Sequence, residues 1–187
     1  NPTCLSAARD FAMDPVTITA ASGLRSRMDS LELLANNLAN AATSGYKDDR
    51  EFYGLLTTDP SSDESATLPM VEKQWTDFSQ GTLLPTGNPL HVALSGRGFF
   101  AANGPAGPVY TRNGSFRTSA TGELVTSEGF PVRTDSGGTI SVAPAKAIEI
   151  GSDGTVRQDK AVLGRIAVVD FGTTASLKKM TGAYFEN

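Results

Sequence analysis

The feature that most constrains this chain is a long amphipathic helix near the N-terminus. Asp14-Pro15 is typical of a helix start, because aspartate can cap the first N–H groups and proline lacks an N–H where none is needed. Behind it, apolar and small residues recur at alternating steps of four and three, the spacing of a helix packed against a partner helix. Such a helix spans about 40 Å. The members of this seam are Thr17, Ala21, Leu24, Met28, Leu31, Ala35, Leu38 and Ala42.

The end of the predicted helix carries a cluster of amide side chains and a glycine. Asn36, Asn37 and Asn40 lie among small apolar residues, and Gly45 suits the left-handed conformation that often follows a helix. A buried amide in a helix pair fixes the register of the two helices at some cost in stability. Two interpretations stay open: the helix joins helices of other chains, or it lies across its own β domain with the amides facing water. The small residues of the seam favour the first.

Four parts are predicted along the chain. Residues 1–12 form an extension, residues 13–45 form the helix, and residues 46–80 form a charged and polar connecting segment with partial order. Over residues 81–187, short β-type runs alternate with turns such as Asn113-Gly114. The predicted fold class is therefore mainly β, an antiparallel domain of many short strands with a long N-terminal α-helix.

The β region consists of short runs rich in β-branched and aromatic residues. The best of them, 163–171, predicts one continuous strand, whereas 177–180 predicts the start of a helical or turn segment. The other predicted strands are 90–94, 98–101, 109–111, 114–117, 123–126, 139–142, 148–150 and 155–157.

The composition argues against catalysis, metal binding and nucleic-acid binding. The net charge is −4 and the basic residues are scattered, so no basic face for nucleic acid is predicted. One cysteine, Cys4, and one histidine, His91, exclude the usual zinc and iron sites. His91 lies between two apolar residues and is interpreted as a structural side chain. We predict that the protein is not an enzyme and uses no cofactor or metal.

The sequence predicts neither a membrane helix nor a cleaved signal peptide. No apolar run approaches the ~18 residues that a membrane-spanning helix needs. Asp10 and Asp14 interrupt the basic-then-apolar pattern of a secretory signal. Direct membrane insertion is therefore not expected.

Three blocks of the sequence resemble the flagellar rod and hook proteins of bacteria. They are residues 13–47, 78–100 and 110–132, in the order expected for that family. The most specific motif runs from Ala35 to Lys47, with Ala35-Asn36-Asn37-Leu38-Ala39-Asn40 followed by Thr43-Ser44-Gly45-Tyr46-Lys47. The resemblance is to rod proteins of the FlgF and FlgG type, and the passage 148–166 favours the proximal rod type, FlgF, over the distal type, FlgG.

The resemblance implies a structural subunit of the flagellar basal-body rod, which assembles helically through terminal helices and transmits motor torque to the hook. Its implied partners are copies of itself, other rod and hook proteins, and the type III export apparatus. It would reach the periplasmic rod without a cleaved signal peptide. By the resemblance a C-terminal helix should follow Asn187; it is absent, so we expect the chain to be truncated there. By resemblance, the seam would consist of Leu24, Met28, Leu31, Ala35 and Leu38, the register would be set by Asn36, Asn37 and Asn40, and the chain would turn toward the outer layer at Gly45 and Tyr46.

Two other classes of function remain open on the residues alone. A β-rich surface or carbohydrate-binding module with an accessory helix requires an exposed aromatic platform, for which the single tryptophan, Trp75, is the candidate. A small hydrolase requires an activity that depends on His91. Specific glycan binding would favour the first class, and loss of activity on replacing His91 would favour the second.

Overall fold

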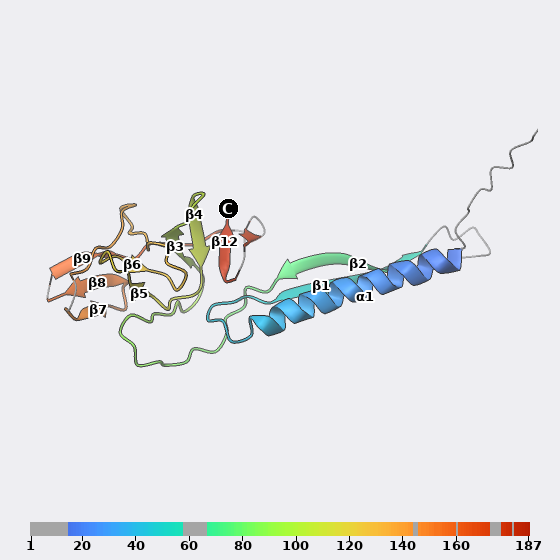
Figure 1. Cartoon of the computed structure of the whole chain (residues 1–187), viewed down its shortest axis with the longest axis horizontal. Helices are drawn as coiled ribbons and strands as arrows, with labels where there is room; N and C mark the ends of the chain where they lie inside the picture. Colours follow the sequence, from blue (N-terminus) through green and yellow to red (C-terminus); the bar gives the residue numbers. More distant parts are fainter. Residues whose placement is uncertain (1–14, 58–66, 144–145, 160, 173–176, 181) are drawn as a thin grey trace, which may run out of the picture. The chain divides into compact units, whose positions relative to one another are not determined.

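The computed structural model describes residues 15–57, 67–143, 146–159, 161–172, 177–180 and 182–187. The predicted fold class is confirmed: one helix, α1 (Pro15–Ala39), precedes short strands that pair antiparallel (Figure 1). The chain divides into two units, one joining the part up to Leu38 with Asp49–Thr76, the other joining Ala39–Asp48 with Asp77–Asn187. The predicted extension 1–12, with Cys4, lies outside the described residues. No helix in the described ranges has the length and apolar character needed to cross a bilayer.

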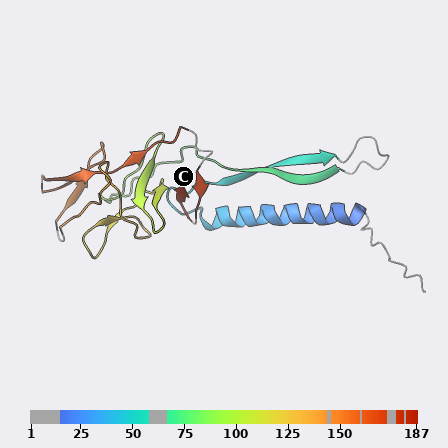
Figure 2. The same cartoon turned by 90° about the horizontal axis from the view of Figure 1, so that it is seen from above.

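The first unit consists of α1 and a β-hairpin made of β1 (Asp49–Thr57) and β2 (Thr67–Thr76). The two strands pair along their whole length, with a bulge after Phe52. Both views show α1 running alongside this hairpin (Figures 1 and 2). The segment 46–80, predicted as a connecting segment, thus contains two paired strands. Charged pairs such as Arg50-Glu51 in β1 interrupt the apolar pattern and concealed these strands in the sequence.

α1 ends at Ala39, earlier than the predicted end near Gly45. The carbonyl of Asn40 accepts the N–H of Thr43 at 2.9 Å, and the carbonyl of Thr43 accepts the N–H of Tyr46 at 3.2 Å. The chain therefore leaves the helix through tight turns, helped by asparagine and threonine side chains that compete with helical hydrogen bonds. Gly45 does adopt a left-handed φ of 73°, but it closes these turns and not the helix.

The second unit is organised by a five-stranded antiparallel sheet of order β10-β3-β4-β12-β11. The helical or turn segment predicted at 177–180 was wrong, because Lys178 and Lys179 pair with the strand that follows them. That pairing depends on a partner strand that no local pattern reveals. The strands of this sheet are β3 (Phe99–Asn103), β4 (Pro108–Thr111), β10 (Val168–Val169), β11 (Lys178–Lys179) and β12 (Tyr184–Glu186).

Two smaller sheets complete the second unit. The continuous strand predicted at 163–171 was wrong, because the chain changes sheet near Ile166, which forms an isolated bridge with Thr134. The residues before this point pair with β8 and those after it pair with β3. The strands of the smaller sheets are β5 (Arg117–Thr118), β6 (Leu124–Val125), β7 (Ile148–Ile150), β8 (Thr155–Gln158) and β9 (Ala161–Arg165).

The main core of the second unit lies where these small sheets meet. Phe100 and Phe116 pack edge to face with ring centroids 5.1 Å apart. On the opposite face of β3, Phe99 packs against Phe78 and Phe185. Because strands alternate their side chains, β3 contributes to both clusters. The buried members of the main core are Phe100, Phe116, Leu124, Val132, Ile140, Val142, Ile148, Val156 and Ile166.

Candidate assembly interface

The apolar residues of α1 lie on a face that the rest of the chain leaves exposed. Leu24, Met28 and Leu31 are 62%, 63% and 64% exposed, and Leu38 is 75% exposed. Their spacing of four and three places them on one side of the helix, together with the exposed Ala35. A helix normally buries such a face, and a contiguous exposed apolar surface marks a site of association. We call these five residues the α1 stripe.

The hairpin of the first unit binds the other side of α1. Ser26, Ser30 and Asn37 are spaced by four and seven residues, so they share a face roughly opposite the α1 stripe. Ser26 is buried, and the hydroxyl of Ser30 donates to the carboxylate of Glu51 in β1. Polar contacts therefore join α1 to its own hairpin, and the half-buried Leu33 lies on the same side as Ser26, while the α1 stripe stays outside. An ordinary helix lying across its own β domain would show the reverse arrangement.

Asn37 fixes the start of the hairpin through two hydrogen bonds. Its Nδ2 donates to the carbonyl of Asp49 at 2.8 Å, and the N–H of Asp49 donates to its Oδ1 at 3.2 Å. The hydroxyl of Thr76 donates to the carboxylate of Asp49 at 2.7 Å, which ties the end of β2 to the same point. The structure therefore places Asn37 in an intrachain clamp, whereas Asn36 is exposed on α1 and Asn40 lies in the turn that follows.

Replacing Asn37 by alanine should loosen the hairpin. The change removes both hydrogen bonds to the Asp49 backbone, which we expect to cost about 1–3 kcal/mol of local stability. Hydrogen exchange at the amides of β1 should become faster, and Arg25→Ala, at an exposed position of the same helix, should leave it unchanged. Equal exchange in both variants would contradict a clamping role for Asn37.

Gly45 and Tyr46 secure the turn after α1 within the second unit. A Cβ on Gly45 would lie 2.4 Å from the backbone nitrogen of Asn113, so only glycine allows this approach. Lys179 Nζ lies 4.0 Å from the centroid of the Tyr46 ring and donates to the carbonyl of Lys47 at 2.6 Å. The structure thus brings Gly45 against the backbone that follows β4, and Tyr46 against β11.

Lys47 is a structural residue that no pattern in the sequence indicated. Its ammonium is buried and donates to the carbonyl of Ser79 at 2.6 Å. Burial lowers the pKa of Lys47 and the positive charge of Arg112 lowers it further, while Asp77 and Asp48 act in the opposite direction. The charged run that follows Tyr46 was interpreted as solvated, and nothing local in it distinguishes the one lysine that is buried.

His91 and Trp75, on which the alternative functions depend, make local contacts. The amide of Asn88 donates to His91 Nε2 at 3.2 Å, which leaves the Nδ1–H to donate to Thr86 Oγ1 at 3.0 Å. Trp75 stacks with Arg50 across the hairpin, with 5.9 Å between the guanidinium carbon and the ring centroid. Within the described ranges, no three His, Cys, Asp or Glu side chains are grouped to hold a metal ion.

The chain is similar to proteins of the bacterial flagellar rod and hook. Residues 93–158 match the family described as the flagellar hook protein FlgE/F/G D1 domain, and residues 19–47 match the flagella basal body rod protein family. The chain is 33% identical to the flagellar basal-body rod protein FlgG of Agrobacterium fabrum in an alignment of 187 positions, gaps included, which covers 86% of this chain and 69% of that protein. This chain belongs to the flagellar basal-body rod protein family. The second matched region contains the whole α1 stripe.

Relatives of both rod types are found. The chain is 35% identical to FlgF of Caulobacter vibrioides over 144 residues, covering 74% of this chain and 59% of that protein. It is 31% identical to FlgG of Bacillus subtilis in an alignment of 182 positions, gaps included, which covers 85% of this chain and 68% of that protein. The chain therefore spans about three-fifths of the length of the FlgF relative. The resemblance to rod and hook proteins is confirmed at the level of the family.

Proposed function

We propose that this chain is a structural, non-enzymatic subunit of the flagellar rod that assembles through the α1 stripe. The observation that carries the proposal is the arrangement of α1, which binds its own hairpin with a polar face and leaves its apolar face exposed. Helices of neighbouring subunits would cover that face. Membership of the rod protein family supports the proposal that such packing occurs in a rod.

The energetics of the stripe suit a repeated assembly. Burial of a leucine or methionine side chain contributes about 1.5–3 kcal/mol, and the stripe offers several such side chains in each subunit. The small Ala35 at the centre of the stripe permits close approach of a second helix. A contact repeated in every subunit can thus build a shaft stiff enough to carry motor torque to the hook. Leu24, Met28, Leu31, Ala35 and Leu38 are the proposed contact residues.

The proposed partners follow from the family. They are copies of this chain, other rod and hook proteins, and the flagellar type III export apparatus, which would deliver the chain to the periplasmic rod without signal cleavage.

We favour the proximal rod type, FlgF, on the passage 148–166. Asn36 and Asn40 are proposed to set register with a neighbouring helix, in addition to the clamp that Asn37 forms within its own chain.

An in-frame deletion of the gene tests the proposal directly. We expect non-swimming cells whose purified basal bodies show rings without a completed rod or hook by electron microscopy, and restoration of rods and swimming by the intact gene. The point at which assembly stops would distinguish the proximal from the distal type. Complete rods and normal swimming in the deletion strain would overturn the proposal.

A further inference from the structure

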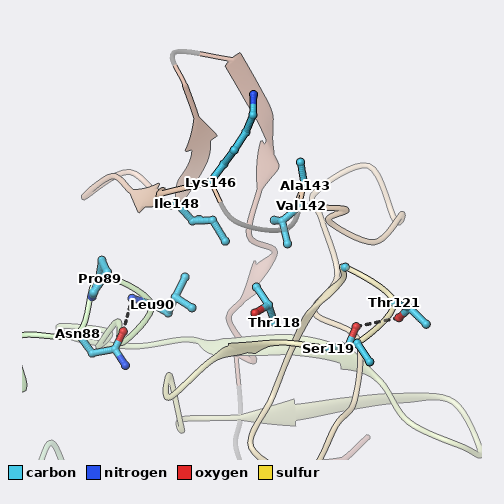
Figure 3. A pocket seen from close by; sticks show the side chains of 12 residues that line it. Asn88, Pro89, Leu90, Thr118, Ser119, Thr121, Val142, Ala143, Lys146 and Ile148 are labelled. Atoms are coloured by element: carbon cyan, nitrogen blue, oxygen red, sulfur yellow. Dashed lines mark hydrogen bonds between the residues drawn. The ribbon is translucent and has the colours of Figure 1, made fainter.

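Outside a rod, the α1 stripe can be covered only by a surface as long as itself. From Leu24 to Leu38 it extends over about 21 Å of helix. The hollow on the second unit is too small: it holds about 460 Å³, and Leu90, Thr118 and Ile148 are among its described lining residues (Figure 3). A volume of this size suits a small molecule or one or two side chains. A second helix with a matching apolar face fits the stripe better.

We propose that two copies of the free chain cover each other's α1 stripe by pairing their α1 helices antiparallel. The stripe residues occupy alternating positions a and d of a heptad, with Met28 at position a and Leu31 at position d. In an antiparallel helix pair, position a of one helix faces position d of the other. Met28 of each copy then faces Leu31 of the other copy at the centre of the contact. This central pairing fixes the register along the rest of the stripe.

Side-chain sizes are complementary in this register. The large Leu24 of one copy faces the small Ala35 of the other, and Leu38 faces Ala21, which is also exposed. Large side chains opposite small ones allow two helices to interdigitate at an even separation. A parallel pair in register would instead place leucine against leucine and alanine against alanine, so that crowded layers alternate with gaps. Side-chain size therefore favours the antiparallel orientation.

The charges beside the stripe are complementary in the same arrangement. Arg25 and Glu32 occupy heptad position e on one flank of the stripe, and both are exposed. In the part of the chain that the structure describes, neither of them forms an ion pair. Positions e meet across an antiparallel helix pair, which places Arg25 of each copy near Glu32 of the other. Two ion pairs between the copies result, and such flanking pairs select the partner and the orientation of paired helices.

The opposite flank of the stripe is apolar in this arrangement. Arg27 and Leu34 occupy heptad position g there, and Leu34 is 61% exposed in the single chain. Positions g also meet across an antiparallel pair. The aliphatic stem of Arg27 can therefore cover Leu34 of the other copy while its guanidinium stays in water. Arg27 needs no acidic partner in the dimer, and this distinguishes it from Arg25.

The antiparallel dimer is closed and cannot be a repeating unit of a rod. Each copy uses the same surface on the other, so the α1 stripe has no place left for a third copy. Subunits related by a helical repeat all point the same way along the rod, whereas the dimer reverses one copy. The dimer would thus keep the chain from polymerising by occupying the surface that rod assembly needs. Only this competition rests on the proposed rod function; the dimer contact itself does not.

Sedimentation equilibrium of the purified chain of 187 residues tests the contact. We expect a reversible equilibrium between monomer and dimer. Arg25→Glu should raise the Kd about tenfold, because both ion pairs become repulsive, and adding Glu32→Arg to the same chain should restore it. Arg27→Glu is the matched control, with the same change of charge on the other flank, and should leave the Kd within about twofold. Circular dichroism checks that every variant keeps its helix.

Two outcomes of this measurement would overturn the proposal. One is a chain that stays monomeric up to its solubility limit. The other is a dimer that Arg27→Glu weakens as much as Arg25→Glu. If Glu32→Arg repairs the Arg27→Glu chain and not the Arg25→Glu chain, the helices are parallel, because a parallel pair brings positions g and e together.

Disulfide cross-linking tests the orientation and the register independently. In a Cys4→Ser background, chains with Leu24→Cys are mixed with chains with Ala35→Cys and oxidised. We expect the mixed dimer to form, and each variant alone to stay monomeric on a non-reducing gel. Cross-linking of the Leu24→Cys chain to itself would contradict the antiparallel pair. Loss of the dimer in both experiments would leave the rod function standing, whereas normal rods in the deletion strain would contradict the rod function and not the dimer.

Discussion

Replacing Leu31 by aspartate is expected to abolish swimming while leaving the β-rich unit folded. Leu31 lies in the middle of the α1 stripe and is 64% exposed in the free chain, so the change should alter the stability of the monomer by no more than about 0.5 kcal/mol. In an assembled rod the new carboxylate would be buried against a neighbouring helix without a partner, which costs several kcal/mol per subunit. Swimming assays and electron microscopy of basal bodies measure the loss of assembly. Circular dichroism measures whether the β-rich unit stays folded.

Arg25→Asp is the matched control for this variant. Arg25 is also exposed on α1, but it lies about 100° around the helix from Leu24 and outside the α1 stripe. The same acidic side chain should there leave rods and swimming intact. Normal rods in the Leu31→Asp strain would show that the α1 stripe is not the assembly surface.

Replacing Gly114 by alanine should unfold the second unit or destabilise it by at least about 3 kcal/mol. The added Cβ would lie 1.8 Å from the carbonyl oxygen of Val92 and 3.0 Å from the ring of Phe100. The backbone cannot easily move apart, because the N–H of Val92 donates to the carbonyl of Gly114 at 3.0 Å. Denaturant unfolding followed by circular dichroism measures the loss.

Gly81→Ala provides the comparison for the Gly114 variant. Nothing lies within 4 Å of a Cβ at Gly81, and its φ is not in the left-handed region, so we expect a change in unfolding free energy within about 0.5 kcal/mol. Equal stability of the two variants would mean that the second unit can relax around Gly114. From the sequence, Asn113-Gly114 predicts only a turn. In the structure, the carbonyl of Val92 approaches Gly114 so closely that a side chain at this position would clash.

Local patterns were sufficient for part of this description. The helix, its apolar face and its start near Pro15 depend on residues within a few turns of one another, so periodicity and capping revealed them. Most of the short strands between residues 99 and 158 were predicted from β-branched residues and glycine turns for the same reason. The motif from Ala35 to Lys47 was enough to indicate the family.

The sequence by itself determined that α1 has an apolar face, because helical geometry sets which residues share a side. The tertiary structure alone decided that this face stays exposed, since the polar side of α1 binds Asp49 and Glu51 of the hairpin. It also decided the burial of the Lys47 side chain, whose ammonium donates to the carbonyl of Ser79, 32 residues away. A contact between residues so far apart in the sequence depends on the tertiary fold that brings them together. The local conformational preferences of the two residues do not determine it.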